Sequence, residues 1–106
     1  MTSKLIRKLL IFSVFIPLHA VSADSNLPSI LVFGDSLSAA YGIEEEEGWV
    51  NLLEERVKGE ALSFRIVNGS VSGETSTGGV ERLPGMLVTY SPKVVIIELG
   101  GNDGLR

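Results

Sequence analysis

One apolar stretch, "KVVIIELG" at Lys93–Gly100, constrains the fold of this sequence more than any other. It is continuous, with hardly any polar alternation, and such a strand is typical of a parallel sheet that is covered on both faces. Two more runs of apolar and β-branched residues, "SILVF" at Ser29–Phe33 and "SFRIVN" at Ser63–Asn68, are each followed by a glycine. We therefore expect three strands.

Helical spacing of apolar residues fills both gaps between the expected strands. Gly48–Lys58 predicts an amphipathic helix, and about Thr77–Tyr90 predicts a second one, which Pro84 must kink or restart. The expected inner residues are Trp49, Leu52, Leu53 and Val57 in the first helix and Val80, Leu83, Leu87 and Val88 in the second. The order β-α-β-α-β predicts a doubly wound α/β domain with a parallel sheet.

The N-terminal residues have the pattern of a signal peptide. Lys4, Arg7 and Lys8 precede an apolar run, Leu9–Leu18, and small residues follow up to Ala23. This run is shorter than the roughly 20 residues needed to cross a bilayer, so we expect no stable membrane anchor. We therefore expect residues 1–23 to be a signal peptide cleaved near Ala23, and residues 24–106 to form a periplasmic or secreted domain.

The charge of the expected mature chain disfavours nucleic acid as a partner. The whole chain has a formal net charge of −4, and residues 24–106 keep all 13 acidic residues but only six basic ones, which gives −7. Phosphate binding relies on clustered Lys and Arg, which this composition lacks. The acidic run Glu44–Glu47 is consecutive rather than spaced like cation ligands, so it predicts a solvated loop without chemistry.

Polar loops follow all three expected strands: "GDSLS", "NGSVSGETS" and "GGND". The carboxyl ends of parallel strands share one edge of the sheet, where open α/β sheets bind ligands. Each loop alone has the composition of an ordinary turn, and Ser36 and Ser38 are equally good helix caps. Together, the loops offer what acyl transfer needs, namely a serine nucleophile and several donors that converge on an oxyanion. The sequence thus predicts one composite site.

The stretches "FGDSLSAAYG", "NGSVSGETSTGG" and "IIELGGNDGLR" resemble the first three conserved blocks of the GDSL, or SGNH, hydrolase family. They are most similar to its branch of bacterial periplasmic acyl-CoA thioesterase I, lysophospholipase and arylesterase. The resemblance runs from about Ile30 to Arg106, with the blocks in the family's order and spacing. It implies a flavodoxin-like three-layer α/β/α fold.

The resemblance also implies residue roles. Ser36 matches the family's nucleophilic serine, whose N–H also belongs to the oxyanion hole, and Gly73 and Asn102 match the other two oxyanion donors. Asp35 is expected to hold the loop and not to act as the acid of a catalytic triad. The implied reaction is hydrolysis of carboxylic esters or thioesters of acyl or aryl groups through a Ser36 acyl-enzyme. The expected partner is therefore a small-molecule ester or thioester, and no metal or cofactor is implied.

The sequence departs from the family pattern in one respect. The family's fourth block, Asp-x-x-His, supplies the base and its orienting carboxylate, but it has no counterpart here, and the one histidine, His19, lies in the expected signal peptide. We therefore expect residues 24–106 to be the N-terminal part of an SGNH hydrolase domain, truncated after the third strand. Such a piece should be inactive alone, because losing the base costs on the order of a million-fold in turnover. The alternatives are a non-catalytic exported α/β domain that binds a small ligand such as a lipid or glycan, an inactive remnant or, among enzymes, a carbohydrate esterase.

Overall fold

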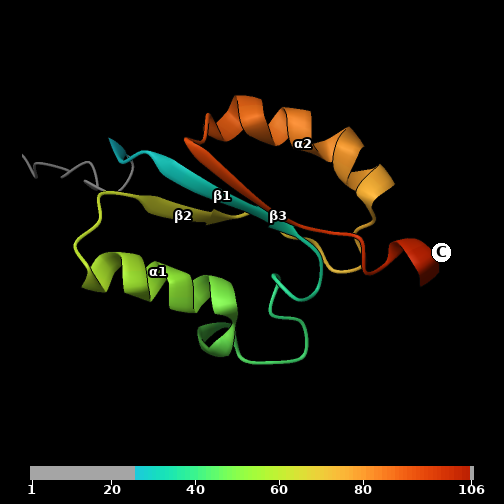
Figure 1. Cartoon of the computed structure of the whole chain (residues 1–106), viewed down its shortest axis with the longest axis horizontal. Helices are drawn as coiled ribbons and strands as arrows, with labels where there is room; N and C mark the ends of the chain where they lie inside the picture. Colours follow the sequence, from blue (N-terminus) through green and yellow to red (C-terminus); the bar gives the residue numbers. More distant parts are fainter. Residues whose placement is uncertain (1–25, 106) are drawn as a thin grey trace, which may run out of the picture.

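The computed structural model of the chain describes residues 26–105, so the expected signal peptide, residues 1–23, lies outside the described residues. Figure 1 shows one sheet between two helices. The strands are β1 (Ser29–Gly34), β2 (Arg65–Asn68) and β3 (Val94–Glu98), and the helices are α1 (Trp49–Gly59) and α2 (Ser76–Tyr90). Two short 3-10 helices, η2 (Glu45–Glu47) and η3 (Asp103–Leu105), complete the described elements. Every expected strand and helix is present, with bounds close to the predicted ones.

The three strands are parallel and lie in the order β2-β1-β3. β1 is central, since Ile30 is opposite both Ile66 of β2 and Val94 of β3. α1 and α2 cover opposite faces of the sheet (Figure 1). This arrangement confirms the predicted parallel α/β/α fold. Because the chain winds outward from β1 in both directions, the topological switch point lies between β1 and β3, where such sheets bind ligands.

The core of the described structure is formed by β1 and not by β3. Residues 31–33 of β1 are fully buried, whereas Val94 and Ile97 of β3 are 44% and 59% exposed. The prediction that Lys93–Gly100 is buried on both faces is therefore wrong for β3. The strand that is buried on both faces is β1. The reason lies in position: within residues 26–105, β3 pairs with β1 alone, and an apolar groove beside Ile97 stays open.

α2 packs on the sheet through Gly79, which the sequence did not place on the inner face, and through Leu83, which is half-buried beside Phe33 as predicted. Gly79 is buried, and a Cβ at this position would lie 2.8 Å from Leu99 Cδ1 and 3.1 Å from Phe33 Cε1. Val80 and Val88 are 74% and 82% exposed, so their predicted inward placement is wrong. Val80 lines the open apolar groove beside Ile97 and Leu99, and it is exposed because no element within residues 26–105 covers that groove.

α1 shows a similar shift of its inner face. Its buried residues are Val50 and Val57, whereas Leu52 is 50% exposed and Trp49 is 36% exposed. The prediction is therefore right for Val57 and wrong for Leu52. Trp49 has a specific partner nonetheless, because its indole N–H donates to Ser38.

Pro84 does not interrupt α2, which continues from Ser76 to Tyr90. A proline removes the hydrogen bond to the carbonyl four residues earlier, here Val80. Because Val80 is exposed, water can solvate that carbonyl. The helix begins at a cap in which the Thr75 hydroxyl accepts the N–H of Gly78 at 3.1 Å.

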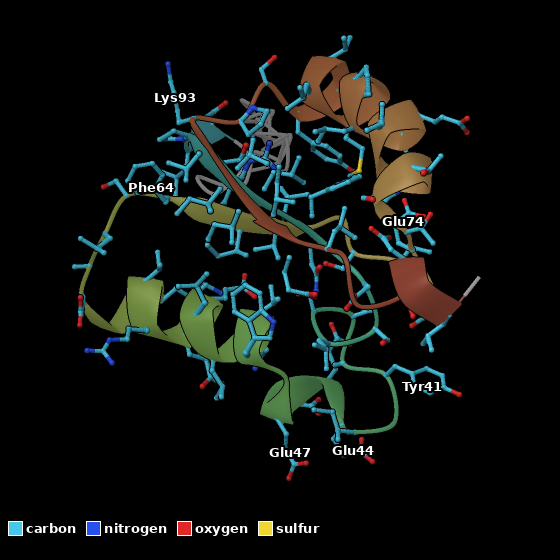
Figure 2. The ribbon with its side chains drawn as sticks, turned by 45° about the vertical axis from the view of Figure 1, so that its right-hand side comes forward. Tyr41, Glu44, Glu47, Phe64, Glu74 and Lys93 are labelled. Carbon is cyan, nitrogen blue, oxygen red and sulfur yellow. The ribbon has the colours of Figure 1, made fainter. Side chains whose placement is uncertain are left out.

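The acidic run Glu44–Glu47 is exposed along its whole length. Figure 2 shows Glu44 and Glu47 pointing outward from the region of η2. These side chains are solvated, as the sequence predicts. In the part of the chain that the structure describes, neither helix is long and apolar enough to cross a membrane.

Candidate active site

The loops that follow β1, β2 and β3 lie at one end of the sheet, on the right in Figure 1. The first and second loops are joined by the Val71 N–H, which donates to the Gly34 carbonyl at 3.0 Å. The third and second loops are joined by Asn102 Nδ2, which donates to the Glu74 carbonyl at 2.9 Å. The three residues expected from the sequence therefore lie on connected loops at the carboxyl edge, next to the switch point.

Ser36 lies in a tight turn directly after β1. The buried residue Asp35 shapes this turn, because its Oδ1 accepts the Leu37 N–H at 3.0 Å and its carbonyl accepts the Ala39 N–H at 2.9 Å. Asp35 therefore holds the loop, as expected. Within residues 26–105, neither the N–H nor the hydroxyl of Ser36 has a hydrogen-bond partner, and the residue is only partly buried. Both groups are available to a bound molecule.

Ser38, the other serine of this loop, has a different environment. It is 2% exposed, its hydroxyl donates to Glu98 Oε1 at 2.7 Å, and the same hydroxyl accepts the Trp49 indole N–H at 3.1 Å. Neither serine caps a helix, because residues 36–42 form turns and Ala40 has a left-handed φ of 58°. The structure thus separates two serines that the sequence left equivalent as caps: Ser38 is structural, and Ser36 is accessible.

Gly73 lies in the loop between β2 and α2. Its φ of 82° belongs to the left-handed region that favours glycine, and its N–H has no partner among the described residues. The adjacent residue Glu74 is anchored by an ion pair, in which Arg82 Nε lies 2.9 Å from Oε1. The Arg82 guanidinium also lies over the ring of Phe33, 4.3 Å from its centroid. Figure 2 shows Glu74 near the start of α2 and η3, so this pair anchors the loop that presents Gly73.

Asn102 and Asp103 attach the third loop to the second. The Asn102 side chain uses one N–H for the Glu74 carbonyl, and its second N–H has no acceptor in the described structure. The Asp103 carboxylate accepts hydrogen bonds from the hydroxyl and the backbone N–H of Ser76, the first residue of α2. These two bonds lower the pKa of Asp103 from its ordinary value. Asp103 thereby fixes the loop that carries Asn102 against the N-terminus of α2, where the helix dipole also favours a carboxylate.

The four carboxylates around the site accept hydrogen bonds that hold its loops in place. Asp35, Glu74, Glu98 and Asp103 all accept hydrogen bonds from neighbouring loops or helices. Sequence reasoning missed the contact between Glu98 and Ser38, for which the available signal is a single carboxylate at the end of an otherwise apolar strand. No cluster of three His, Cys, Asp or Glu side chains in residues 26–105 is arranged to hold a metal ion.

The fold places the chain in the class of three-layer α/β/α proteins, with three connected polar loops at the carboxyl edge of a parallel sheet. Residues 32–106 match the model of the GDSL-like Lipase/Acylhydrolase family, and the chain belongs to this family. The match confirms the resemblance seen in the three sequence blocks.

Similar proteins carry the names of esterases and related hydrolases. The chain is 46% identical over 97 residues to esterase TesA of Pseudomonas aeruginosa, a match that covers 92% of this chain and 48% of TesA. It is 41% identical over 96 residues to thioesterase 1/protease 1/lysophospholipase L1 of Escherichia coli, with 91% of this chain and 43% of that protein covered. A crystal structure of TesA matches with a TM-score of 0.71 at 54% identity, over 74% of this chain and 43% of that one. The chain thus spans a little under half the length of the relatives it matches.

Proposed function

We propose that this chain belongs to a serine esterase or thioesterase in which Ser36 forms an acyl-enzyme. The observation that carries the proposal is the contrast between the two serines of one loop. Ser38 is buried and bonded as both donor and acceptor, whereas Ser36 has an unpaired hydroxyl and an unpaired N–H at the carboxyl edge of the sheet. Membership of the family and the names of the relatives support ester or thioester substrates with acyl or aryl groups.

In the proposed reaction, Ser36 Oγ attacks the acyl carbon while a base takes the hydroxyl proton, and the carbonyl oxygen becomes an oxyanion. The N–H groups of Ser36 and Gly73 and the second N–H of the Asn102 amide donate to this oxyanion. A single donor of this kind typically contributes about 3–4 kcal/mol to the transition state. Collapse of the tetrahedral intermediate releases the alcohol or thiol, which takes the proton from the base. Water then hydrolyses the acyl-enzyme through the same steps.

The base is proposed to be the histidine of an Asp-x-x-His block, as the family resemblance implies. Residues 20–106 contain no histidine, and the carboxylates of Asp35 and Glu98 already accept hydrogen bonds from the Ser36 loop. A serine hydroxyl is a weak nucleophile unless a neighbouring base removes its proton. The proposed activity is therefore that of a protein in which this chain and the Asp-x-x-His block occur together, and the reaction uses neither a metal nor a cofactor.

The test is the replacement of Ser36 in the full-length protein. Ser36→Ala should lower kcat for p-nitrophenyl butyrate and for an acyl-CoA by about 10⁴-fold or more while the melting temperature stays the same. Ser63→Ala, at an exposed serine between α1 and β2, is the matched control and should leave kcat unchanged. A Ser36→Ala protein that keeps more than about one tenth of the activity would show that Ser36 is not the nucleophile.

A second candidate function is a non-catalytic domain that binds a lipid or glycan through the same loops, because the unpaired N–H groups of Ser36 and Gly73 can bind a polar ligand group without a base. A fluorophosphonate probe separates the two functions, because it reacts covalently with an activated serine and not with a mere binding site. Labelling at Ser36 supports the esterase, and reversible binding of an acyl ester without labelling or hydrolysis supports the binding domain. Acetylated sugars in the same assay test the carbohydrate esterase alternative.

We also propose that the protein is exported to the periplasm or secreted after cleavage near Ala23. The basic residues before the apolar run Leu9–Leu18 support this proposal. Sequencing the N-terminus of the protein from the periplasmic fraction or the medium should identify Asp24 as the first residue. An uncleaved N-terminus in the cytoplasmic fraction would contradict it.

A further inference from the structure

Glu98 holds the Ser36 turn on both sides of the candidate nucleophile. Its Oε1 accepts the N–H of Asp35 at 3.3 Å and the hydroxyl of Ser38 at 2.7 Å. Asp35 directly precedes Ser36, and Ser38 follows it by two positions. A single oxygen atom from the end of β3 therefore joins the two ends of the segment that contains Ser36, although Glu98 and Ser38 are 60 residues apart in the sequence.

The hydrogen bonds around Glu98 have only one possible direction. An indole N–H can donate but cannot accept, so the bond from Trp49 Nε1 uses Ser38 Oγ as its acceptor. The one proton of the Ser38 hydroxyl is then donated to Glu98. Glu98 is therefore the final acceptor in the series of hydrogen bonds from Trp49 through Ser38. A side chain without an oxygen at position 98 would leave the buried Ser38 hydroxyl without an acceptor, and a buried unpaired polar group is costly.

The space for this contact exists because residue 34 is a glycine. Gly34 is opposite Glu98 in the register of β1 and β3. A Cβ at Gly34 would lie 2.7 Å from Ser38 Oγ and 2.8 Å from Glu98 Oε1, distances that a real Cβ does not adopt. The end of β1, the Glu98 carboxylate and the buried Ser38 thus pack together on both sides of Ser36 in the sequence.

We propose that Glu98 is a positioning residue that holds the N–H and the hydroxyl of Ser36 in the geometry needed for acyl transfer. The inference rests on the proposed function. An oxyanion hole works when its donors lie about 2.7–3.1 Å from the developing charge, and a displacement of about 0.5 Å already weakens it. Glu98 acts through Asp35 and Ser38, so its loss should reduce kcat and leave KM nearly unchanged.

The test compares Glu98→Met with Glu98→Gln in the full-length protein. Met has a similar length without an acceptor, and Gln keeps an oxygen for the Asp35 N–H and the Ser38 hydroxyl. With p-nitrophenyl butyrate, Glu98→Met should lower kcat about 10- to 100-fold with KM within about twofold, since oxyanion donors act mainly on kcat. Glu98→Gln should restore kcat to within about fivefold of the wild type, because a neutral acceptor is weaker than a charged one. Glu81→Gln, at an exposed position of α2, is the control and should change neither constant.

Titration of active sites with a fluorophosphonate corrects kcat for any unfolded protein. A corrected kcat of Glu98→Met equal to that of the wild type, or an equal loss in Glu98→Gln and Glu98→Met, would overturn the positioning role. If Glu98→Met does not fold, Ser38→Ala removes the same bond from the other side and should lower kcat in the same range, and unchanged turnover there would also overturn it. Activity that survives Ser36→Ala would instead overturn the proposed function, so the two failures are distinguishable.

Discussion

Gly34→Ala should strongly destabilise the protein, because the added methyl group has no free space at the end of β1. Its Cβ would lie 2.9 Å from the backbone carbonyl of Glu98, in addition to its close contacts with Ser38 Oγ and Glu98 Oε1. The carbonyl belongs to a paired strand, so it can move only if the β1–β3 ladder shifts. Overpacking of this kind typically costs about 1–3 kcal/mol. Displacement of the Glu98 carboxylate adds the loss of a hydrogen bond to a charged group, which contributes about 1.5–3 kcal/mol.

The free energy of unfolding should therefore fall by about 2.5–6 kcal/mol, a large fraction of the 5–15 kcal/mol typical of a domain. Urea unfolding followed by circular dichroism measures this change. Gly85→Ala is the matched control: a Cβ at Gly85 has no neighbour within 4 Å, and alanine should stabilise α2 by up to about 1 kcal/mol. A Gly34→Ala protein within about 0.5 kcal/mol of the wild type would refute the packing argument, since surface changes commonly stay inside that range.

Two further predictions concern the other two loops. The lowered pKa of Asp103 means that its stabilising effect is fully present above the unfolded-state pKa of about 3.9 and is lost as the pH falls through the folded-state pKa. The difference in urea midpoint between the wild type and Asp103→Asn should thus be constant from about pH 5 to 7 and shrink below about pH 4, and a difference that persists unchanged to about pH 2 would contradict the assignment. Gly73→Ala places a Cβ at a φ of 82°, which costs about 1–2 kcal/mol in urea unfolding and should also lower kcat by displacing the Gly73 N–H. Gly59→Ala, with open space around the added Cβ, is its control, and equal kcat values for the two variants would argue against Gly73 as an oxyanion donor.

The order of elements could be predicted from the sequence because it depends on local patterns. Apolar runs closed by glycine mark β1 and β3, and helical spacing marks α1 and α2. The positions of the three polar loops then follow from the parallel sheet alone, since consecutive parallel strands end at the same edge.

Packing contacts could not be predicted in the same way. Side-chain hydrophobicity predicts the apolar side of α2 but not that the closest contact with Phe33 and Leu99 is made by Gly79, nor that Val80 borders an open groove. The distinction between Ser36 and Ser38 depends on Glu98 and Trp49, which no local pattern connects to this loop. The family resemblance already singles out Ser36 in the sequence, whereas the structural role of Ser38 is visible only in its three-dimensional contacts.

The parallel crossover connections have a consequence for when the site can form during folding. The Ser36 turn depends on contacts with Glu98, more than 60 residues later in the chain, and Asn102 follows β3. Contacts of such large sequence separation form late, because their loop-closure entropy must be overcome before they contribute. A nascent or unfolded chain therefore carries Ser36 without its assembled surroundings. For an exported chain, as proposed here, the Ser36 turn would therefore be complete only after the β1–β3 ladder has formed, long after residue 36 itself has been synthesised.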